Sequence, residues 1–130
     1  MAREKTGDCK DTRSTLDTEI CLEKESKISE SNYRAFTGAI RQLLSLTYLQ
    51  LNPSYAPGPT GQPLNADERL REFDTLQSAW ENYRKIAVDS AYNQFKGGTH
   101  APVFAAVTDQ LLVRTHMREL DSIYISALRL

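Results

Sequence analysis

The clearest pattern along the chain is one apolar stripe between Asp74 and His100. Apolar residues recur there at spacings of three and four, which is typical of one face of an α-helix, and they are Leu76, Trp80, Tyr83, Ala87, Ala91 and Phe95. Gln77 and Arg84 lie on or beside this stripe, one on each side of the only tryptophan. Buried polar groups cost free energy unless they are paired. A buried Arg84 needs a carboxylate or several carbonyls as partners, and we expect the Gly97-Gly98-Thr99 turn and the last helix to supply them.

A second helical pattern precedes this stripe. From Leu16 to Thr47 the apolar residues keep a helical period for about nine turns. Ser14 followed by Asp17 suits the N-cap of this helix. Its first half is strongly charged, so we interpret it as a solvated face with a thin apolar stripe.

The segment 52–64 separates these two helices. It contains four of the five prolines and two of the six glycines, a composition that predicts a loop. Connections between helices usually take about two to eight residues, so this one is long. It is either a slack connector or a binding loop led by Tyr55. Asn65 and Glu68 then form a capping pair that opens the next helix.

The central helix is predicted to end at Gly97-Gly98, since paired glycines release the chain from the helical region. Thr99 or His100 can cap a third helix of about 25 residues with Pro102 in its first turn. Its apolar residues are Val103, Val107, Leu111, Leu112, Leu120, Ile123, Tyr124 and Leu128. With no competing strand signal, the sequence predicts an all-α antiparallel bundle of three long helices. Residues 1–130 then form a single domain with a flexible start at residues 1–8.

Composition narrows the classes of function. The 130 residues carry sixteen basic and seventeen acidic side chains, a formal charge of -1. That balance lacks the basic excess of a nucleic-acid-binding protein. The most apolar stretch, Leu43–Leu51, is about half as long as a membrane span. Residues 1–5 show no signal peptide, so we expect any export leader to have been removed from this chain.

Catalytic patterns are missing from the sequence. His100 and His116 lie sixteen residues apart without a metal-binding spacing, so we interpret both as structural or surface residues. The glycine pair follows a helix instead of a strand, which is the wrong context for a phosphate-binding loop. No serine nucleophile elbow is present. We therefore expect a protein without enzyme activity, cofactor or metal ion.

The two cysteines leave two possibilities open. Cys9 and Cys21 lie on either side of a predicted helix start, so the N-terminal segment can fold back and form a disulfide. A closed loop of this size adds roughly 3 kcal/mol of stability. Such a bond points to the periplasm or the cell surface. The alternative is a pair of free thiols in a cytosolic protein.

Several of these residues together resemble one known family. The set Gln77, Trp80, Tyr83 and Arg84, followed by Gly97, Gly98, Thr99 and a last helix with Arg114, is similar to the LprI-type lysozyme-inhibitor family of bacteria. The spacing from Cys9 to Cys21 also matches the opening of that family. The resemblance covers the chain from Cys9 to about Tyr124. It implies a small, exported, helical protein, periplasmic or secreted. Gln77, Trp80 and Arg84 are either a binding site or part of the buried core, and we favour the core because Trp80 lies in the middle of the apolar stripe.

The chain departs from the family pattern at two further cysteine positions, which here are Val88 and Val107. Because both positions carry apolar residues of similar volume, we expect a packed pair in place of a disulfide.

The resemblance implies that the protein binds and inhibits a cell-wall hydrolase of lysozyme type by covering its surface. Lysozymes are strongly basic, so an acidic patch would favour binding. The residues that we expect to contact such a partner are Tyr55, Glu19, Glu23 and Glu30, with Glu25 beside them. The alternative is a structural or assembly module of the envelope that binds proteins without inhibiting an enzyme.

Overall fold

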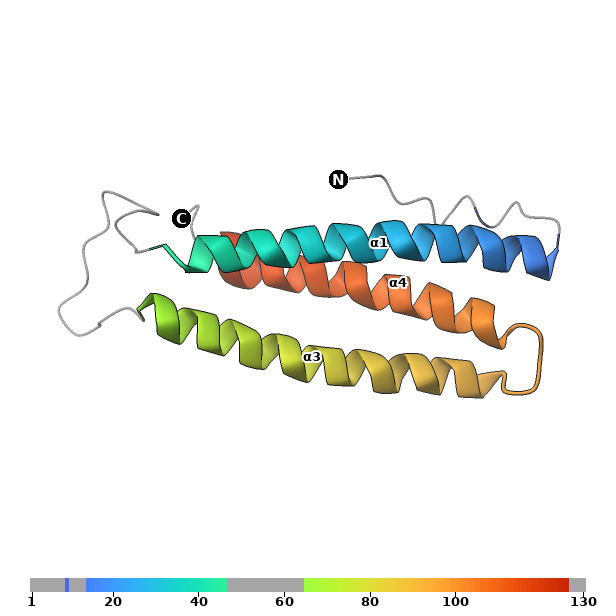
Figure 1. Ribbon diagram of the computed structural model, residues 1–130. Helices are drawn as coiled ribbons and strands as arrows, with labels where there is room; N and C mark the ends of the chain where they lie inside the picture. The colour runs from blue at the N-terminus through green and yellow to red at the C-terminus, as the bar shows by residue number, and fades with distance from the viewer. Residues whose placement is uncertain (1–8, 10–13, 47–64, 127–130) are drawn as a thin grey trace.

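Three long helices make up the computed structural model, which describes residue 9 and residues 14–46 and 65–126. Helix α1 spans Thr15–Leu44, α3 spans Ala66–Gln94 and α4 spans Ala101–Leu120, and a π-helical turn at Asp121–Ile125 extends α4. Helix α3 runs antiparallel to the other two (Figure 1). The predicted all-α bundle of three long helices is thus confirmed.

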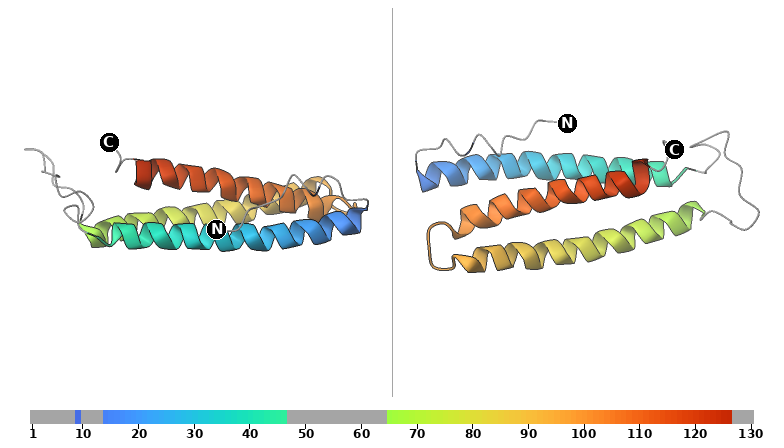
Figure 2. Two further views of the ribbon diagram at one scale, coloured as in Figure 1. Left: turned by 90° about the horizontal axis from the view of Figure 1, so that it is seen from above. Right: turned by 180° about the vertical axis from the view of Figure 1, so that it is seen from behind.

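Helix α4 is the element that holds the bundle together. Seen from above, it lies on one side of the pair formed by α1 and α3, and it lies between them when seen from the front (Figures 1 and 2). It packs extensively on both of its neighbours, whereas α1 and α3 contact each other over a much shorter stretch. Residues on α4 therefore reach both other helices.

The predicted helix starts are confirmed. The Ser14 side chain accepts a hydrogen bond from the Asp17 backbone N–H at 3.1 Å, which satisfies one of the exposed donors at the start of α1. Asn65 does the same for Glu68 at 2.9 Å, and the two side chains are also bonded to each other. His100, not Thr99, occupies the N-cap of α4, with Pro102 in the first turn. Gly97 adopts a positive φ of 89°, a conformation that strains residues with a Cβ.

The hydrophobic core runs through the middle of the three helices. Its buried members are Tyr33, Ile40, Leu44, Phe73, Trp80, Val113 and Leu120. The stripe predicted on α3 is correct at Trp80 and Ala91 but wrong at its edges, since Tyr83 is 57% exposed and Phe95 is 45% exposed. Tyr83 therefore does not belong to the buried face of α3.

The predicted apolar face of α4 is correct in part: Leu120 is buried, and Leu112 and Tyr124 pack against the core. Val107 and Leu111 lie on the surface, whereas the buried face carries Ala101, Ala105, Gln110, Val113, His116 and Leu120. Polar Gln110 and His116 interrupt the apolar pattern on the face that packs inward. The expected Val88–Val107 pair is also not buried, because Val107 is 41% exposed and Val88 is only half-buried.

A buried arginine closes the end of α1. Arg69 in the first turn of α3 donates to the backbone carbonyl of Leu44 at 3.0 Å and also to that of Leu46. Carbonyls in the last turn of a helix have no partner within the helix. Arg69 supplies that partner, and it joins the start of α3 to the end of α1.

The sulfur atoms of Cys9 and Cys21 form a disulfide, with 5.8 Å between the two Cα atoms. The predicted link between the N-terminal segment and α1 is therefore present. Among the helices of the described residues, none combines the length and the apolar composition that a membrane crossing requires. Tyr55, the loop 52–64, the segment 1–8 and Leu128 lie outside the described residues.

Candidate functional site

Gln77, one of the two polar residues on the predicted stripe of α3, forms hydrogen bonds with side chains of both other helices. The Gln77 amide nitrogen donates to the Tyr33 hydroxyl of α1 at 2.7 Å, and its amide oxygen lies 2.6 Å from Nε2 of His116 on α4. The Tyr33 hydroxyl in turn donates to the Glu81 carboxylate at 3.3 Å. Gln77 thus links all three helices at one level of the bundle.

The direction of each bond in this chain follows from the chemistry. The ionised carboxylate of Glu81 can only accept, so the Tyr33 hydroxyl donates to it and accepts from Gln77. The Gln77 amide oxygen must then face His116, and Nε2 of His116 must carry the proton. Nδ1 of His116 is therefore unprotonated, and it has no hydrogen-bond partner in the described part of the chain.

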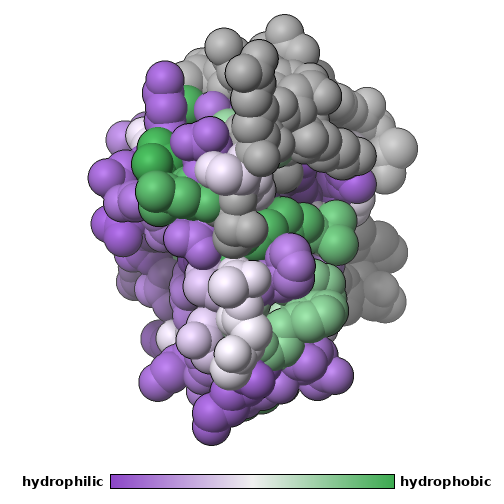
Figure 3. Space-filling view, turned by 90° about the vertical axis from the view of Figure 1, so that its right-hand side faces the viewer, coloured by the Kyte–Doolittle hydropathy of each residue, from purple (hydrophilic) through white to green (hydrophobic). Residues whose placement is uncertain are grey.

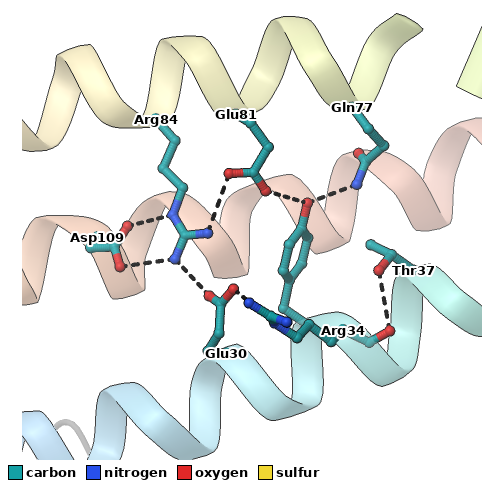
Figure 4. A network of polar contacts seen from close by, with 8 residues as sticks. Glu30, Arg34, Thr37, Gln77, Glu81, Arg84 and Asp109 are labelled. Atoms are coloured by element: carbon teal, nitrogen blue, oxygen red, sulfur yellow. Dashed lines mark hydrogen bonds and ion pairs between the residues drawn. The ribbon is translucent and has the colours of Figure 1, made fainter. Parts of the chain in front are cut away.

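Arg84 lies one turn from Glu81 and binds carboxylates from three helices (Figure 4). It donates to Asp109 of α4 through Nε at 2.6 Å and Nη2 at 3.0 Å. Nη2 also binds Glu30 of α1 at 2.7 Å, and Nη1 lies 3.6 Å from Glu81 of α3 itself. All three guanidinium nitrogens are thus engaged, and the arginine side chain is only 15% exposed.

An aromatic cluster covers the inner side of this network. The His116 ring stacks on Trp80 with 3.9 Å between centroids and an angle of 8° between planes. Tyr33 packs against Trp80 at 5.3 Å, and the Arg84 guanidinium carbon lies 5.4 Å from the Trp80 ring centroid. An arginine at this distance from an aromatic ring gains cation–π attraction in addition to its ion pairs.

The surroundings shift the pKa values of four residues at this site, Glu30, Tyr33, Arg84 and His116. The hydrogen bonds that Arg84 donates to Asp109 raise the pKa of Arg84, so its charge is fixed. Burial raises the pKa of Glu30, but Arg84 and Arg34 outweigh it and hold that pKa below its usual value. Burial raises the pKa of Tyr33 to about 12 and lowers the pKa of His116 to about 4.

These observations favour a structural role for Gln77, Trp80 and Arg84. A general base or nucleophile needs a side chain that can reach a substrate with its reactive atom. Here the polar atoms of Arg84 and Gln77 are used between helices, and His116 is buried beneath Trp80. The described residues also contain no group of three or more acidic, His or Cys side chains placed to hold a metal ion.

The glycine turn of the motif lies apart from this network. Gly97, Gly98 and Thr99 form the turn between α3 and α4, and that turn supplies no partner to Arg84. The turn and the last helix were the two expected sources of partners for Arg84. Of these, only the last helix supplies one, and α1 supplies another. Arg114 is half-buried on α4, two residues from His116, so it projects from a different side of the helix. Tyr83 is exposed.

Several of the acidic residues predicted to bind a partner are buried or already form ion pairs within the chain. Glu23 forms an ion pair with Lys27 at 3.6 Å, and Glu30 is bound by both Arg34 and Arg84. Glu25, grouped with them in the sequence, is 4% exposed and contributes nothing to an acidic surface. Glu19 and Glu23 share the side of α1 that carries Glu30. The acidic patch is therefore smaller than the sequence suggests.

Sequence reasoning missed four residues that complete these interactions: Tyr33, Asp109, His116 and Arg69. Arg69 precedes Leu76 by seven residues, so extending the apolar stripe backwards would have placed it on the inward face of α3. His116 carries a similar signal, since it lies four residues from both Leu112 and Leu120 of the predicted apolar stripe. Asp109 lies on no such stripe, so the sequence gives no comparable signal for it.

An open groove of about 630 Å³ runs along the outer side of the network between α1 and α3. The residues that line it have polar or charged side chains, and they include Glu30, Tyr33, Gln77 and Glu81. These four side chains are already bonded to one another or to Arg84. The groove is therefore the outer surface of the polar network.

Comparisons of the chain with known protein families, with curated proteins and with solved structures find no match. The resemblance of Gln77, Trp80 and Arg84 to the lysozyme-inhibitor motif stays a prediction.

Proposed function

We propose that the protein is an exported, non-catalytic module that binds another protein through its outer surface. The observation that carries this proposal is which side chains of the bundle are buried and which are exposed. Gln77, Trp80 and Arg84 contact side chains of the other helices inside the bundle. In contrast, large apolar side chains remain exposed on all three helices, among them Leu16, Ile20, Ile86, Phe104 and Leu111. Groups of exposed apolar residues often mark protein-binding surfaces.

The proposed location outside the cytoplasm rests on the Cys9–Cys21 bond. Disulfides persist in oxidising compartments and are rare in the cytosol of most organisms. A bond between a terminal segment and α1 fits a periplasmic or secreted protein.

The partner we propose first is a cell-wall hydrolase of lysozyme type, which the protein would inhibit by covering its surface. The motif resemblance and the carboxylates of Glu19 and Glu23 support this choice, since a basic enzyme is attracted to acidic surface. The test is an assay of lysozyme activity on bacterial cell walls with increasing amounts of the protein. Inhibition that saturates at a fixed molar ratio is the expected result. Unchanged activity with every lysozyme tried would refute this choice of partner.

The loop residue Tyr55 provides a separate test of the same proposal. Tyrosine offers a large contact area at a modest loss of conformational entropy. If the loop 52–64 contacts the enzyme, Tyr55→Ala should weaken inhibition by about 1–2 kcal/mol. Inhibition by a variant without the loop that equals inhibition by the unaltered protein would exclude the loop.

A second candidate function, an assembly module of the envelope, is favoured by one feature of α4. Phe104, Val107 and Leu111 form an exposed apolar stripe on its outer side. The stripe ends at Arg118, seven residues after Leu111, and carries no acidic residue. A basic enzyme is a poor match for this surface, whereas an envelope protein with an acidic or neutral helix would fit it.

A further inference from the structure

The outer side of α4 carries an exposed apolar stripe, which we call the α4 stripe and define by Phe104, Val107 and Leu111. The exposed fractions of these residues are 40%, 41% and 61%. Their spacing of three and then four residues is that of the seams along which helices pack on one another. Figure 3 views the bundle from the end where α4 begins, and it shows hydrophobic side chains at the surface among hydrophilic ones. The α4 stripe is therefore suited to contact a second helix.

The two neighbouring helices leave this stripe uncovered. Seen from above, α4 lies on one side of the pair formed by α1 and α3, so its outer side points away from both (Figure 2). Phe95 at the end of α3 contacts the stripe at one edge, where its ring meets Phe104 edge-on with 4.9 Å between centroids. Phe95 is nevertheless 45% exposed, so this contact leaves both rings partly open to water.

A cationic side chain marks the other end of the same side of α4. Leu111 lies seven residues after Phe104 and seven residues before Arg118, so the three share one side of the helix. Arg118 is exposed and forms no ion pair within the part of the chain that the structure describes. Helix α4 spans Ala101–Leu120, which places Leu111 at its middle. The outer side of α4 is thus aromatic at one end and cationic at the other, with Leu111 midway.

This arrangement is complementary to a second copy of itself that runs in the opposite direction. An antiparallel pair centred on Leu111 brings the two Leu111 side chains together and places Arg118 of each copy beside Phe104 of the other. An arginine within about 6 Å of an aromatic ring is attracted to it. A parallel pair would instead place Arg118 against Arg118, and opposed like charges disfavour association.

The neighbouring charges fit the same antiparallel arrangement. Lys96 follows Phe95 at the aromatic end, and Glu119 follows Arg118 at the cationic end. Glu119 comes one turn after His116, whose ring stacks against α3, so it lies on the α3 side of the stripe, as Lys96 does. Antiparallel pairing therefore brings Glu119 of one copy toward Lys96 of the other.

We propose that two copies of this chain form a dimer through the α4 stripe, with the two α4 helices antiparallel and Leu111 on the twofold axis. Because only one helix of each copy takes part, the contact buries less than the roughly 800 Å² per partner of a standard interface, so the dimer is weak and depends on concentration. It leaves the outer surfaces of α1 and α3 free. Dimerisation therefore does not depend on which other protein the chain binds.

Sedimentation equilibrium of the full chain over a range of concentrations tests the dimer. The expected result is a reversible equilibrium between monomer and dimer. A chain that stays monomeric up to about 1 mM, the dissociation constant of a very weak complex, overturns the proposal.

Two variants test whether the α4 stripe forms the contact. Leu111→Ser removes apolar surface at the axis and should raise the dissociation constant of the dimer at least about tenfold. Arg118→Gln removes the cation beside Phe104 and should raise it at least about fivefold, because each dimer loses two such contacts.

Matched controls for these variants lie on the other helices. Leu16→Ser on α1 removes an apolar side chain that is 64% exposed, against 61% for Leu111, and Arg71→Gln on α3 removes another exposed arginine. Both controls should change the dissociation constant less than about twofold. Thermal melting checks that every variant keeps its fold. A dimer that the controls weaken as much as the stripe variants do overturns the proposed interface.

Cysteine cross-linking tests the direction and register of the two helices. Leu111→Cys should form a disulfide-linked dimer under mild oxidation, because equivalent residues meet at a twofold axis. Arg118→Cys alone should not, since its two copies lie about 21 Å apart along the helices. A mixture of Phe104→Cys and Arg118→Cys chains should link one to the other. The native cysteines do not compete, because Cys9 and Cys21 are bonded to each other.

A different pattern of cross-links refutes the antiparallel dimer. Arg118→Cys that links to itself as efficiently as Leu111→Cys indicates parallel helices, and Leu111→Cys that forms no link excludes Leu111 from the axis. Either result overturns the proposal even if the chain is dimeric.

Discussion

Arg84 of α3 holds both carboxylate oxygens of Asp109 on α4, with 2.6 Å from Nε to Oδ1 and 3.0 Å from Nη2 to Oδ2. Paired bonds of this kind fix the relative position of two helices, since the planar guanidinium and carboxylate groups must align. Glu30 adds the third helix to the same guanidinium group. One arginine side chain therefore sets the register of the whole bundle.

Removal of the Arg84 charge should destabilise the protein strongly. Arg84→Met keeps a long apolar stem but leaves Asp109 and Glu30 without their main cation. Breaking a well-buried pair from one side costs about 3–5 kcal/mol. Because this network is partly open to water, we expect a loss of about 2–4 kcal/mol in urea unfolding.

A second variant isolates the contribution of the pairing itself. Arg84→Met combined with Asp109→Leu removes one of the two carboxylates that lose Arg84, so it should recover part of the lost stability. A double variant that is less stable than Arg84→Met alone would contradict this account.

The Trp80 ring is expected to be a larger contributor to stability than any other apolar residue of α3. It is buried between Tyr33, His116 and the Arg84 guanidinium. Trp80→Ala should cost roughly 3–5 kcal/mol, because it leaves a cavity and removes the stacking partner of His116. Guanidinium unfolding followed by circular dichroism measures this loss. Tyr83→Ala is the matched control and should change stability by less than about 0.5 kcal/mol, since Tyr83 is exposed.

Much of the fold could be predicted because its signals are local. The apolar period of α3 depends on residues three and four apart, and the caps at Ser14 and Asn65 depend on residues within one turn. The disulfide between Cys9 and Cys21 also closes a short segment. Such features are visible in a single sequence because no distant residue decides them.

The partners of Arg84 could not be predicted to the same extent. The sequence indicates that a buried arginine needs carboxylates, but the choice of Glu30 and Asp109 depends on how three helices are aligned. In the sequence, Glu30 is one more charge on a predicted solvated face. The inward face of α4 is difficult to predict for a related reason: His116 is polar, yet it is buried because Gln77 and Trp80 supply its contacts.

Arg69 should stabilise the end of α1 by capping it. Its side chain donates to the carbonyl groups of Leu44 and Leu46. Hydrogen bonds from charged groups contribute about 1.5–3 kcal/mol each, so we expect Arg69→Met to lower the free energy of unfolding by about 2–3 kcal/mol. Hydrogen exchange should also become faster at the last amides of α1 and remain unchanged near Arg84. Uniform faster exchange along all helices would argue against a local cap.

Reduction of the Cys9–Cys21 bond should lower stability without unfolding the bundle at room temperature. Closing a loop of this length restricts the unfolded chain by roughly 3 kcal/mol. The urea midpoint should therefore fall after treatment with a reducing agent, while the circular dichroism spectrum in water keeps its helical form. Titration of the denatured, unreduced protein should detect no free thiol, and two reactive thiols would contradict the bond.

The buried imidazole of His116 should make the stability depend on pH. Burial holds its pKa at about 4 in the folded protein, whereas an unfolded histidine titrates near 6.5. Between these two values the unfolded chain binds a proton that the folded protein does not bind. The free energy of unfolding should therefore fall as the pH is lowered from about 6.5 to about 4, by up to about 3 kcal/mol.

Glu30 contributes to the pH dependence of stability mainly below this interval. Arg84 and Arg34 hold its pKa below the usual carboxylate value, so its stabilising effect is lost only at lower pH.

His116→Phe keeps a ring against Trp80 and removes the titration of the imidazole. The slope of the free energy of unfolding between pH 6.5 and 4 should therefore become nearly flat, although the variant is less stable at neutral pH. His100→Gln is the control, since His100 is exposed and its replacement should leave the slope unchanged. Urea unfolding at four or five pH values measures all three slopes, and a slope of His116→Phe equal to that of the unaltered protein would assign the pH dependence to another group.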